Sequence, residues 1–588
     1  MAVRSRRSKT FAILAVVAAI LLLVRLWLAP PEQHDEILFF GGDIETVTSG
    51  RVEALLVRDG RIAAIGTLET VSALTSNSAQ QIDLAGRTLL PGLIEPHTHP
   101  VATAQFGATV DVSGFTHQSR AAVMTTLKEA ADDWTPNGWV IAFGWDPVMV
   151  DDLEPPTLEE LDALAPDKPL VILTQMMHDA YANSAALEVA GITATTPDPK
   201  GGEFVKDETG KLTGVVREVA AIGALFSKVP SPPEGSMDLL VNLQLGAYAR
   251  AGFTTIAAAG LVGSAPDQIG MVKRLSAARD APVQLAIYGL PHQVPSAAAP
   301  EKPSVPGALI GVKYWMDGSP YAGGAAVEDP YEDSALTRER LHLKPGHSGA
   351  LNYELETFRM HFTDYHRRGF QIAVHVQGER AVDRVLDVVE GVLKAHPRKD
   401  HRHRLEHNAL ITNTQLKRAE SLGVTTSFFV DHVTFYGHRL PEIFGADRTA
   451  RYMPTRSALD TGMRISLHSD NPATPIGPFR TFAAAVTRQP LRGGDQIAPD
   501  QALTRLEALR AMTINAAWQL GLEAERGSLD IGKAADLVIV SSNPLTTSDT
   551  GLAAIKAEAT WIAGRPVDRR KTTSANAALL WGTLKAIF

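Results

Sequence analysis

The sequence predicts an α/β protein built on a (β/α)₈ barrel, with a small β-domain at its flanks and a transmembrane helix at its N-terminus. Eight short apolar runs rich in β-branched residues recur after residue 90, and helical-looking segments follow most of them. This alternation is typical of a parallel barrel, and no glycine-rich phosphate fingerprint favours a doubly wound open sheet instead. The eight runs are Leu93–Glu95, Phe253–Ala258, Val283–Tyr288, Leu309–Trp315, Gln371–Val376, His403–Glu406, Val424–Phe428 and Arg464–Leu467.

The composition of the 588-residue chain is that of an ordinary globular protein, with 45% hydrophobic and 21% charged residues. It contains no cysteine, which excludes disulfides, cysteine-ligated zinc, iron–sulfur clusters and a thiol nucleophile. Any metal must therefore be held by His, Asp, Glu or a modified Lys. Because the sequence has no basic patch of the size that nucleic-acid binding needs, we expect no nucleic acid as a partner.

The N-terminal segment, residues 1–35, differs from the rest of the chain in charge and hydropathy. It carries five basic and two acidic residues, whereas residues 36–588 have 51 basic and 63 acidic residues and a net charge of −12. Residues 11–24 have no polar side chain. A helix over residues 11–29 would be about 28 Å long, close to the thickness of a bilayer core.

We therefore expect a single-pass anchor in the cell membrane. The basic residues before Phe11 predict a cytoplasmic N-terminus, so the rest of the chain would lie on the extracytoplasmic, periplasmic side. A signal peptide cleaved near residue 29, which would leave a secreted or periplasmic protein, and a buried core helix are the alternatives. The cleavage site is poor, because Trp27 and Ala29 would flank it and Pro30 would follow the cut.

Two strand-rich regions flank the predicted barrel. Residues 36–90 and 521–567 read as short strands with turns, and together they most simply form one small β-sandwich domain. The barrel then spans 91–520 and contains an insertion at about 105–250, because the first two barrel strands are too far apart for a simple loop. The tail, 568–588, is expected to be a helix docked on the body rather than a second membrane contact.

Six candidate site residues lie at or near the C-terminal ends of predicted barrel strands, the face where barrel enzymes build active sites. In His97-Thr98-His99, alternate residues at a strand end point the same way, so both imidazoles can reach one metal. Each residue alone has a structural alternative, as a buried histidine, a paired lysine or a helix-capping aspartate. Their coincidence at one face favours a site made of His97, His99, Lys313, His375, His407 and Asp470.

The chain also carries an ordered set of motifs. They are Leu90-Pro91-Gly92-Leu93-Ile94 through His97-Thr98-His99, Gly144-Trp145-Asp146, His178 with Asn183-Ser184-Ala185-Ala186-Leu187, Val312-Lys313 with Asp317-Gly318-Ser319, Leu405-Glu406-His407, His468-Ser469-Asp470-Asn471-Pro472, and Gly527-Ser528-Leu529 with Gly532-Lys533-Ala534-Ala535-Asp536-Leu537. With this set, which covers about residues 36–567, the chain resembles the amidohydrolase superfamily. Within it, the chain is most similar to the YtcJ-like branch that includes N-substituted formamide deformylases.

The resemblance implies a TIM-type metal-dependent hydrolase barrel with two divalent metal ions. By analogy, the two ions would be held by His97, His99 and Asp470 and by His375 and His407. Lys313 would bridge them as a carbamate formed with CO₂, since a protonated lysine offers no lone pair to a cation. Zn²⁺ suits imidazole and oxygen ligands, while Mn²⁺, Fe²⁺, Co²⁺ and a single-metal site stay open.

The implied activity is hydrolysis of carbon–nitrogen bonds other than peptide bonds, in amides such as N-substituted formamides or N-acyl amines. The metal would lower the pKa of a bound water toward about 7, and Asp470 would take its proton and return it to the leaving amine. An ester, a lactone or a ring C–N bond as substrate, and a non-catalytic metal-binding scaffold, are the alternatives. We expect a small-molecule substrate, and a homo-oligomer is left open.

Further residues are expected near the barrel mouth. In the resembling family the insertion covers this mouth, so His178 is expected to bind substrate or to support the site, with a purely structural role as the alternative. Trp145, Asp146, Asp317 and His432 are additional candidates for substrate contacts.

Overall fold

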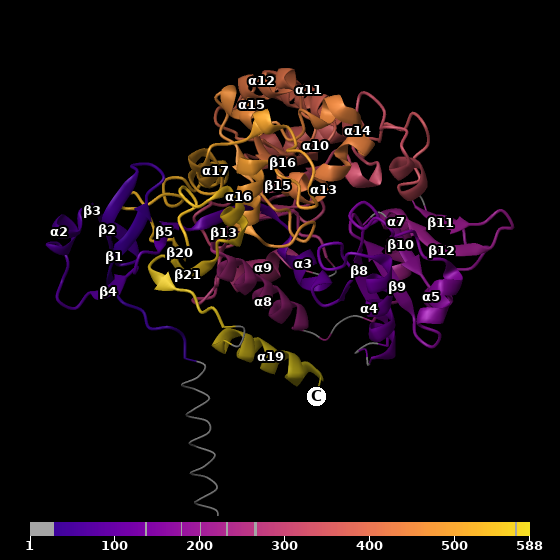
Figure 1. Ribbon diagram of the computed structural model, residues 1–588, viewed down its shortest axis with the longest axis horizontal. Coiled ribbons are helices and arrows are strands. Elements are labelled where there is room, and N and C mark those ends of the chain that lie inside the picture. The colour runs from indigo at the N-terminus through magenta and orange to yellow at the C-terminus, as the bar shows by residue number, and fades with distance from the viewer. Residues whose placement is uncertain are drawn as a thin grey trace, which may run out of the picture.

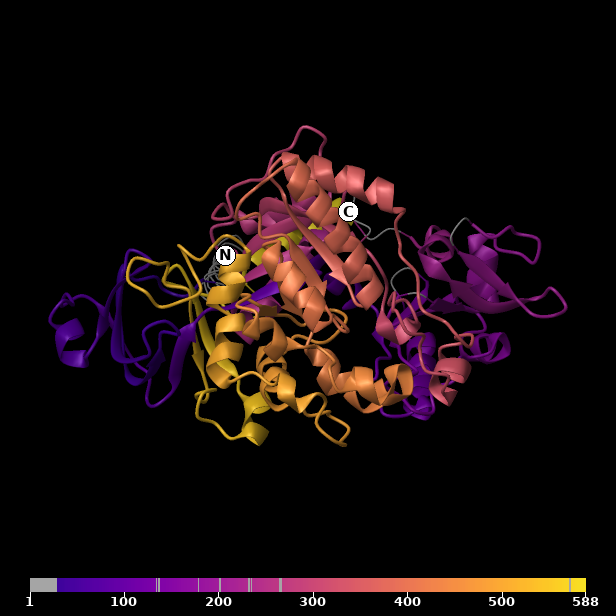
Figure 2. The ribbon, with the colours of Figure 1, turned by 90° about the horizontal axis from the view of Figure 1, so that it is seen from above.

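The computed structural model describes residues 29–587 except 134, 136–137, 178, 200–201, 231–232, 234, 264–266 and 571–572. A parallel barrel lies at the centre, a mixed sheet at one end and an inserted α/β unit at the other (Figure 1). Strands from the two ends of the chain, indigo and yellow, meet beside the barrel in both views (Figures 1 and 2). Of the anchor expected over residues 11–29, residues 11–28 lie outside the described residues. Of the helices that the structure describes, none is sufficiently long and apolar to span a bilayer.

The barrel has eight parallel strands, and each coincides with one of the apolar runs that the sequence predicts. Strands buried on both faces are apolar along their whole length rather than at alternate positions, which is why these runs were visible. In order around the barrel, the strands are β6 (Leu93–Thr98), β13 (Phe253–Ala259), β14 (Gln284–Gly289), β15 (Ala308–Trp315), β16 (Gln371–Val376), β17 (Arg404–His407), β18 (Thr425–Phe428) and β19 (Ser466–Leu467).

Side chains and loop backbone bridge the gap between β6 and the two-residue β19. The backbone N–H and hydroxyl of Ser469 donate to the Glu95 carboxylate, the hydroxyl at 2.8 Å. On the other side, the His99 N–H donates to the Asn471 carbonyl at 2.9 Å. Asp470 lies between these two attachments, so its backbone is fixed against the strand that carries the first histidines.

Helices cover the outside of the barrel, as Figure 2 shows from above. Their apolar residues recur at helical spacing; in α11, for example, Val382, Val385, Leu386 and Val389 face the core. The helices are α8 (Ser236–Ala251), α9 (Gln268–Ser276), α10 (Leu355–Arg367), α11 (Glu379–Ala395), α12 (Asn413–Ser421), α13 (Asp431–Tyr436), α14 (Leu440–Thr449), α15 (Thr455–Asp460), α16 (Pro478–Thr487), α17 (Arg505–Ala511) and α18 (Ile514–Gln519), with the short turns η1 (Pro320–Ala322), η2 (Leu336–Arg340), η3 (Gly437–Arg439) and η4 (Pro499–Gln501).

The strand-rich flanks from both chain ends pair in one continuous eight-stranded sheet. The strands are β1 (Glu36–Glu45), β2 (Arg51–Arg58), β3 (Arg61–Gly66), β4 (Gln80–Asp83), β5 (Thr88–Pro91), β20 (Leu537–Val540), β21 (Ala557–Ile562) and β22 (Arg565–Pro566), with α2 (Leu68–Ser72) and η5 (Asp549–Ala554) beside them. A single sheet results because the ten-residue β1 pairs with β2 on one side and with β4 and then β5 on the other. The sheet surrounds a core in which Phe39 meets Trp561 edge-on.

The first barrel strand continues directly from this sheet. Gly92 alone separates β5 from β6, and its N–H donates to the Asp536 carbonyl at 2.8 Å. A Cβ at Gly92 would lie 2.2 Å from the Thr254 hydroxyl oxygen, so only glycine fits here. The terminal sheet therefore sets the position of the strand that carries His97.

A structured insertion lies between β6 and β13, where the long gap in the barrel pattern predicts one. Its sheet has the order β11-β12-β10-β9-β8-β7, and it has an apolar core of its own that includes Phe143 and Leu173. Its elements are α3 (Pro100–Phe106), β7 (Val110–Asp111), α4 (Arg120–Asp132), β8 (Val140–Trp145), α5 (Leu158–Leu164), β9 (Leu170–Thr174), β10 (Asp179–Ala182), α6 (Ser184–Ala190), β11 (Glu203–Lys206), β12 (Leu212–Arg217) and α7 (Glu218–Phe226).

The tail contains one helix, α19 (Ser574–Ile587), which packs along α8 at the bottom of the molecule in Figure 1. The Asn242 amide of α8 donates to the Asn576 amide oxygen at 2.7 Å, and Thr583 is buried.

Candidate metal centre

Four strand ends bring chemically active side chains together at the C-terminal face of the barrel. His97 is near the end of β6, Lys313 lies in β15, His407 ends β17, and Asp470 comes three residues after β19. His97, Lys313 and His407 are buried, and the Asp470 side chain is 14% exposed. The strand-end pattern in the sequence therefore corresponds to one place in space.

The first candidate ligand group is His97, His99 and Asp470, whose ligand atoms all lie within 4.8 Å of one another. The Nε2 atoms of His97 and His99 are each 3.2 Å from Asp470 Oδ1. Donor atoms at the corners of a tetrahedron around an ion at 2.0–2.1 Å lie about 3.3 Å apart, so this spacing suits a tetrahedral cation. Asp470 Oδ1 is buried and accepts no hydrogen bond from the described residues, as expected for an atom that a cation would satisfy.

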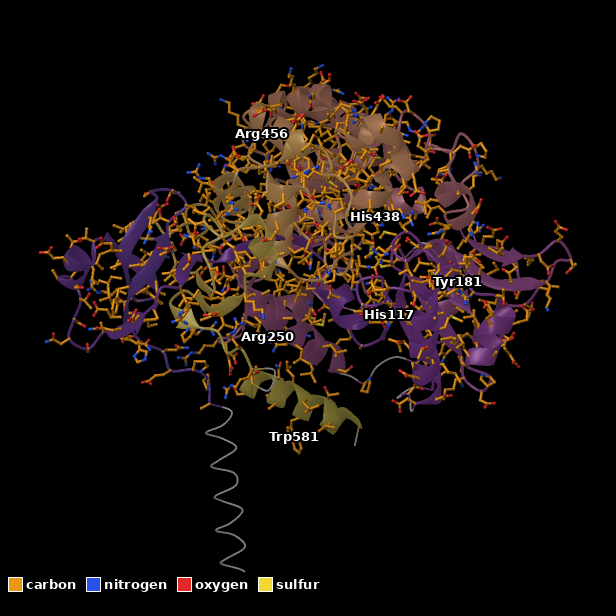
Figure 3. All side chains as sticks on the ribbon, in the orientation of Figure 1. His117, Tyr181, Arg250, His438, Arg456 and Trp581 are labelled. Atoms are coloured by element: carbon orange, nitrogen blue, oxygen red, sulfur yellow. The ribbon has the colours of Figure 1, made fainter. Side chains whose placement is uncertain are left out.

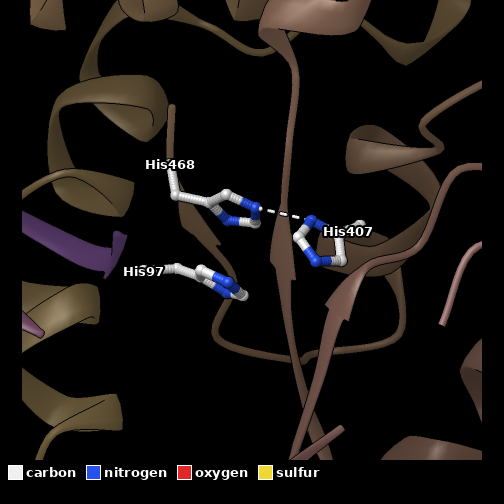
Figure 4. A group of neighbouring side chains, drawn as sticks. All are labelled: His97, His407 and His468. Carbon is white, nitrogen blue, oxygen red and sulfur yellow. Dashed lines mark hydrogen bonds between the residues drawn. The ribbon is translucent and has the colours of Figure 1, made fainter. Parts of the chain in front are cut away.

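The second candidate ligand group shares His97 and adds His407 and His468 (Figure 4). His468 Nε2 lies 3.1 Å from His407 Nδ1, and the other His468 nitrogen contacts the Ser427 hydroxyl at 2.8 Å. His407 Nε2 is buried without a hydrogen-bond partner among the described residues. These imidazole nitrogens, with the carboxylate of Asp470, are a donor set that a divalent metal fits.

Lys313 is buried without a counter-ion within 4 Å among the residues that the structure describes. Its Nζ is 3.2 Å from His97 Nε2 and 5.4 Å from the centre of the Trp315 ring. Burial lowers the pKa of Lys313 to about 8. An ordinary paired lysine at a strand edge, the structural alternative, does not describe this environment.

A buried ion pair orients His97. Glu406 Oε2 accepts a hydrogen bond from His97 Nδ1 at 2.5 Å, which leaves Nε2 free to face Asp470 and Lys313. The Arg404 guanidinium lies against the same carboxylate, with Nη2 at 3.0 Å from Oε2 and Nε at 2.8 Å from Oε1. Burial alone would raise the pKa of Glu406, but Arg404 and His97 hold it well below its usual value.

The backbone at His407 explains how two neighbouring residues both serve the site. Alternation along β17 would send Glu406 and His407 to opposite faces of the strand. His407 instead has φ = 74°, in the left-handed region, and Asp470 has φ = 53°. Such backbone costs of order 1–3 kcal/mol per non-glycine residue and is concentrated at functional sites.

Burial lowers the pKa of His407, His468 and His375 well below the usual value for histidine. These rings are therefore neutral at physiological pH, which is the form that binds metal. Burial alone would raise the pKa of Asp470, but the neighbouring imidazoles of His97, His407 and His99 hold it well below its usual range.

His375 lies beside the two ligand groups, and its Nε2 points to another partner. Its ring centre is 4.3 Å from that of His407, but its Nε2 is 3.6 Å from Asp317 Oδ1 and 3.5 Å from the Gly318 carbonyl. Asp317 accepts backbone N–H groups of Ala326, Gln377 and Gly378, and burial raises its pKa to about 7. Asp317 thus fixes the loops around His375.

The other predicted substrate contacts are buried. Trp145 has no exposed surface and packs edge-on against Tyr181, so the structure gives it a packing role. Asp146 accepts two backbone N–H groups and, at 2.7 Å, the Tyr436 hydroxyl, which ties the insertion to α13. The prediction for His178 lies outside the described residues.

His432 belongs to a buried aromatic group that leads from the insertion toward the ligand groups. Its Nδ1 is 3.3 Å from the Tyr452 hydroxyl, which contacts the Tyr321 hydroxyl at 3.0 Å. The Phe429 ring packs at 4.0 Å from the His432 ring and 5.4 Å from the His468 ring. Phe429 therefore separates His432 from His468, and burial lowers the pKa of His432 to about 3.

Sequence reasoning missed three residues of the centre. His468 stands two positions before Asp470, the same alternate spacing as in His97-Thr98-His99, so its pattern could have identified it. Glu406 and Arg404 gave no such signal, because each could equally be an inward-facing structural charge in β17.

Comparisons with known proteins agree with this geometry. The amidohydrolase family model matches residues 80–568. N-substituted formamide deformylase of Arthrobacter pascens is 28% identical over 543 residues, covering 90% of this chain and 98% of that protein. YtcJ of Bacillus subtilis is 26% identical over 539 residues, covering 90% and 99%. An uncharacterized metal-dependent hydrolase from Pyrococcus horikoshii shares the fold, with a TM-score of 0.69, 22% identity and coverage of 88% and 99%. The chain therefore belongs to the amidohydrolase family, in its YtcJ-like branch.

Proposed function

We propose that the protein is a metal-dependent hydrolase that cleaves an amide-type carbon–nitrogen bond in a small molecule, such as an N-substituted formamide or an N-acyl amine. The observation that carries this proposal is the convergence of His97, His99 and Asp470, with 3.2 Å between donor atoms, in a chain of this family. Similarity to a formamide deformylase over 90% of the chain supports the choice of bond.

A divalent cation, Zn²⁺ by its ligand preference, would be held by His97, His99 and Asp470, and a second by His407 with His375 or His468. When bound, such an ion supplies Lewis acidity, which lowers the pKa of a water toward about 7 and polarises a carbonyl oxygen.

Lys313 would carry a CO₂-derived carbamate between the two positions. Its amine is buried, lies 3.2 Å from His97 Nε2 and has no counter-ion in the described structure. Carbamate formation would replace this unpaired cation with an anionic group whose oxygens can bind a metal. Replacement by alanine should lower metal content, and a small carboxylate such as acetate should restore part of it. A Lys313→Ala protein that holds metal as the parent does would contradict the carbamate.

Asp470 would move the proton. Its Oδ1 faces the two Nε2 atoms of His97 and His99, and its Oδ2 lies 3.9 Å from His407 Nδ1. From this position the carboxylate can accept a proton from a water molecule while the oxygen of that water attacks the amide carbonyl. It can then deliver that proton to the nitrogen as the C–N bond breaks.

The test is Asp470→Asn, which keeps an oxygen donor and removes the base. Turnover should fall by about 10²–10⁴-fold, the usual contribution of a general base, while most of the metal measured by mass spectrometry remains. The exposed Asp500→Asn is the matched control and should keep parental turnover. Near-normal turnover in Asp470→Asn would refute the assignment.

A substrate panel of formamides, N-acyl amines, esters, lactones and ring amines tests the bond. Amide-selective hydrolysis is expected. Preference for an ester, a lactone or a ring C–N bond would keep the site and change the reaction, whereas metal binding without hydrolysis across the panel would favour a scaffold.

We also propose that residues 11–29 anchor the protein in the cell membrane with the body on the extracytoplasmic side. The apolar run 11–24 and the basic residues before it support this location. The anchored protein should resist carbonate extraction from membranes, and proteolysis of intact spheroplasts should remove its body. A body found in the soluble periplasmic fraction would indicate cleavage instead.

A further inference from the structure

The C-terminal helix α19 has an unusual composition for a helix on a protein surface. From Ser574 to Leu584 its sequence, SANAALLWGTL, contains no charged residue. A surface helix ordinarily places charged side chains on the side away from the body, whereas a helix that is apolar all round is covered on all sides. The body covers only one side of α19, where Asn576, Leu579 and Thr583 meet α8 and its surroundings.

The uncovered side of α19 presents three large apolar side chains. Leu580 is 47% exposed, Trp581 61% and Leu584 37%. Residues 580 and 584 are neighbours at i and i+4, and residue 581 lies next to them on the surface opposite Thr583. Figure 3 shows Trp581 on the side of α19 that faces away from the body. We call these three residues the α19 face.

The described chain begins close to this helix. The Ala29 carbonyl accepts a hydrogen bond from Arg570 Nη2 at 2.7 Å, and Arg570 is only four residues before α19. Pro30 and Pro31 line a cavity of about 520 Å³ together with Ser574 at the start of α19. The apolar segment that precedes Ala29 therefore joins the body at the start of the helix that carries the α19 face.

The same cavity is rich in arginine. Arg250, Arg279, Arg565 and Arg570 line it, against the carboxylates of Asp280 and Asp568. Arg250 and Arg279 make no ion pair within 4 Å with any residue that the structure describes. In a chain whose net charge is −9, this is a local excess of positive charge. Phosphate groups of anionic lipids are the charge that such a cavity complements.

We propose that the α19 face lies in the headgroup region of the lipid bilayer that holds the N-terminal segment, with the arginine-lined cavity beside anionic headgroups. The proposal rests on the membrane location proposed above. α19 has 14 residues, about 21 Å of helix, which is too short to span a hydrocarbon core of about 30 Å. It would therefore lie along the surface with its leucines and tryptophan inserted, as interfacial helices do.

The absence of cysteine allows a direct test on the full-length chain. Single variants Leu580→Cys and Leu584→Cys would carry an environment-sensitive fluorophore, and the chain would be reconstituted into phosphatidylcholine vesicles with phosphatidylglycerol. Matched controls are Met360→Cys on α10 and Leu491→Cys, whose parent side chains are 63% and 67% exposed elsewhere on the surface. Figure 1 shows α10 in the upper part of the molecule, whereas α19 lies at the bottom.

We expect blue-shifted emission at 580 and 584, quenched by lipids that carry a shallow doxyl group, and water-like, unquenched emission at 360 and 491. The shift should be smaller in vesicles of pure phosphatidylcholine. Water-like emission at 580 and 584 in vesicle-bound protein would overturn the proposal while leaving the anchor intact. A blue shift without lipid quenching would also overturn it, because a second copy or another protein would then cover the face. Failure of the chain to float with vesicles would refute the membrane location itself, and hydrolytic activity is measured separately.

Discussion

Replacing Glu406 with glutamine would remove the negative charge that holds His97 while keeping a side chain of nearly the same shape. In the parent, this carboxylate accepts from His97 Nδ1 at 2.5 Å and pairs with the buried Arg404 guanidinium. The variant leaves Arg404 without a counter-ion and gives His97 a neutral acceptor. Two separate losses, in folding stability and in metal affinity, should follow.

The structure sets the size of each loss. Arg404 is 1% exposed, and breaking a buried ion pair by removing one partner costs about 3–5 kcal/mol. Arg404 keeps hydrogen bonds to the Tyr288 hydroxyl and the Pro96 carbonyl, both at 3.1 Å, so we expect a value near the lower limit. Loss of a carboxylate behind a metal-binding histidine typically lowers metal affinity by about 10–100-fold.

Two measurements separate these effects. Urea unfolding of the metal-free protein, followed by circular dichroism, gives the stability, and competition with a chromogenic chelator gives the Zn²⁺ affinity. The double variant Glu406→Gln with Arg404→Met removes both charges and should regain much of the stability. Its Zn²⁺ affinity should stay low, because His97 still lacks its carboxylate. If Glu406→Gln alone binds Zn²⁺ as tightly as the parent, Glu406 does not position His97 for a metal.

Three further predictions concern the fold. Burial lowers the pKa of His401 to about 4, below its value of about 6.5 in the unfolded chain. The contribution of His401 to the free energy of unfolding is therefore complete above pH 6.5 and falls by up to about 3 kcal/mol as the pH drops toward 4. His401→Gln should flatten this part of the stability profile measured by urea unfolding. Gly92→Ala would place a Cβ 2.2 Å from the Thr254 hydroxyl oxygen. This clash should lower the free energy of unfolding by about 1–3 kcal/mol, which would be measured as a lower Tm. Tyr436→Phe removes the hydrogen bond to the buried Asp146 carboxylate and should cost about 1.5–3 kcal/mol in the same melt.

Controls make these predictions refutable. His292 is exposed, so His292→Gln should leave the pH profile unchanged, and a His401→Gln profile as steep as the parent's would exclude His401 as a source of the acid sensitivity. Gly223 has no positive φ and has open space where a Cβ would stand, so Gly223→Ala should lower the Tm little; an equally small effect at Gly92 would remove the steric argument. An unchanged Tm in Tyr436→Phe would mean that Asp146 does not need this hydroxyl.

The barrel was predictable because its strands are buried on both faces and therefore form continuous apolar runs. Family membership was also predictable, because His97-Thr98-His99 and the later motifs occur in a fixed order. The strand order of the terminal sheet was not predictable, since no local pattern shows that β1 pairs in succession with β4 and β5.

The details of the centre depend on backbone and long-range contacts that a sequence pattern does not contain. The left-handed φ of His407 is set by the loop that follows β17, so alternation alone could not place Glu406 and His407 in one site. His375 was expected among the ligands by analogy, and only the packed loops show that its Nε2 points toward Asp317. Trp145 was singled out by its motif, and only the structure shows that its ring packs edge-on against Tyr181.

The continuity of β5 and β6 has a consequence for synthesis of the chain. β5 is paired on one side by β20, a strand that the ribosome makes about 450 residues later. At about 5–20 residues per second, the strand that carries His97 waits roughly 20–90 seconds for this neighbour. The part of the chain that contributes the first candidate ligands is thus completed among the last, so metal binding would wait until nearly the whole protein has been translated.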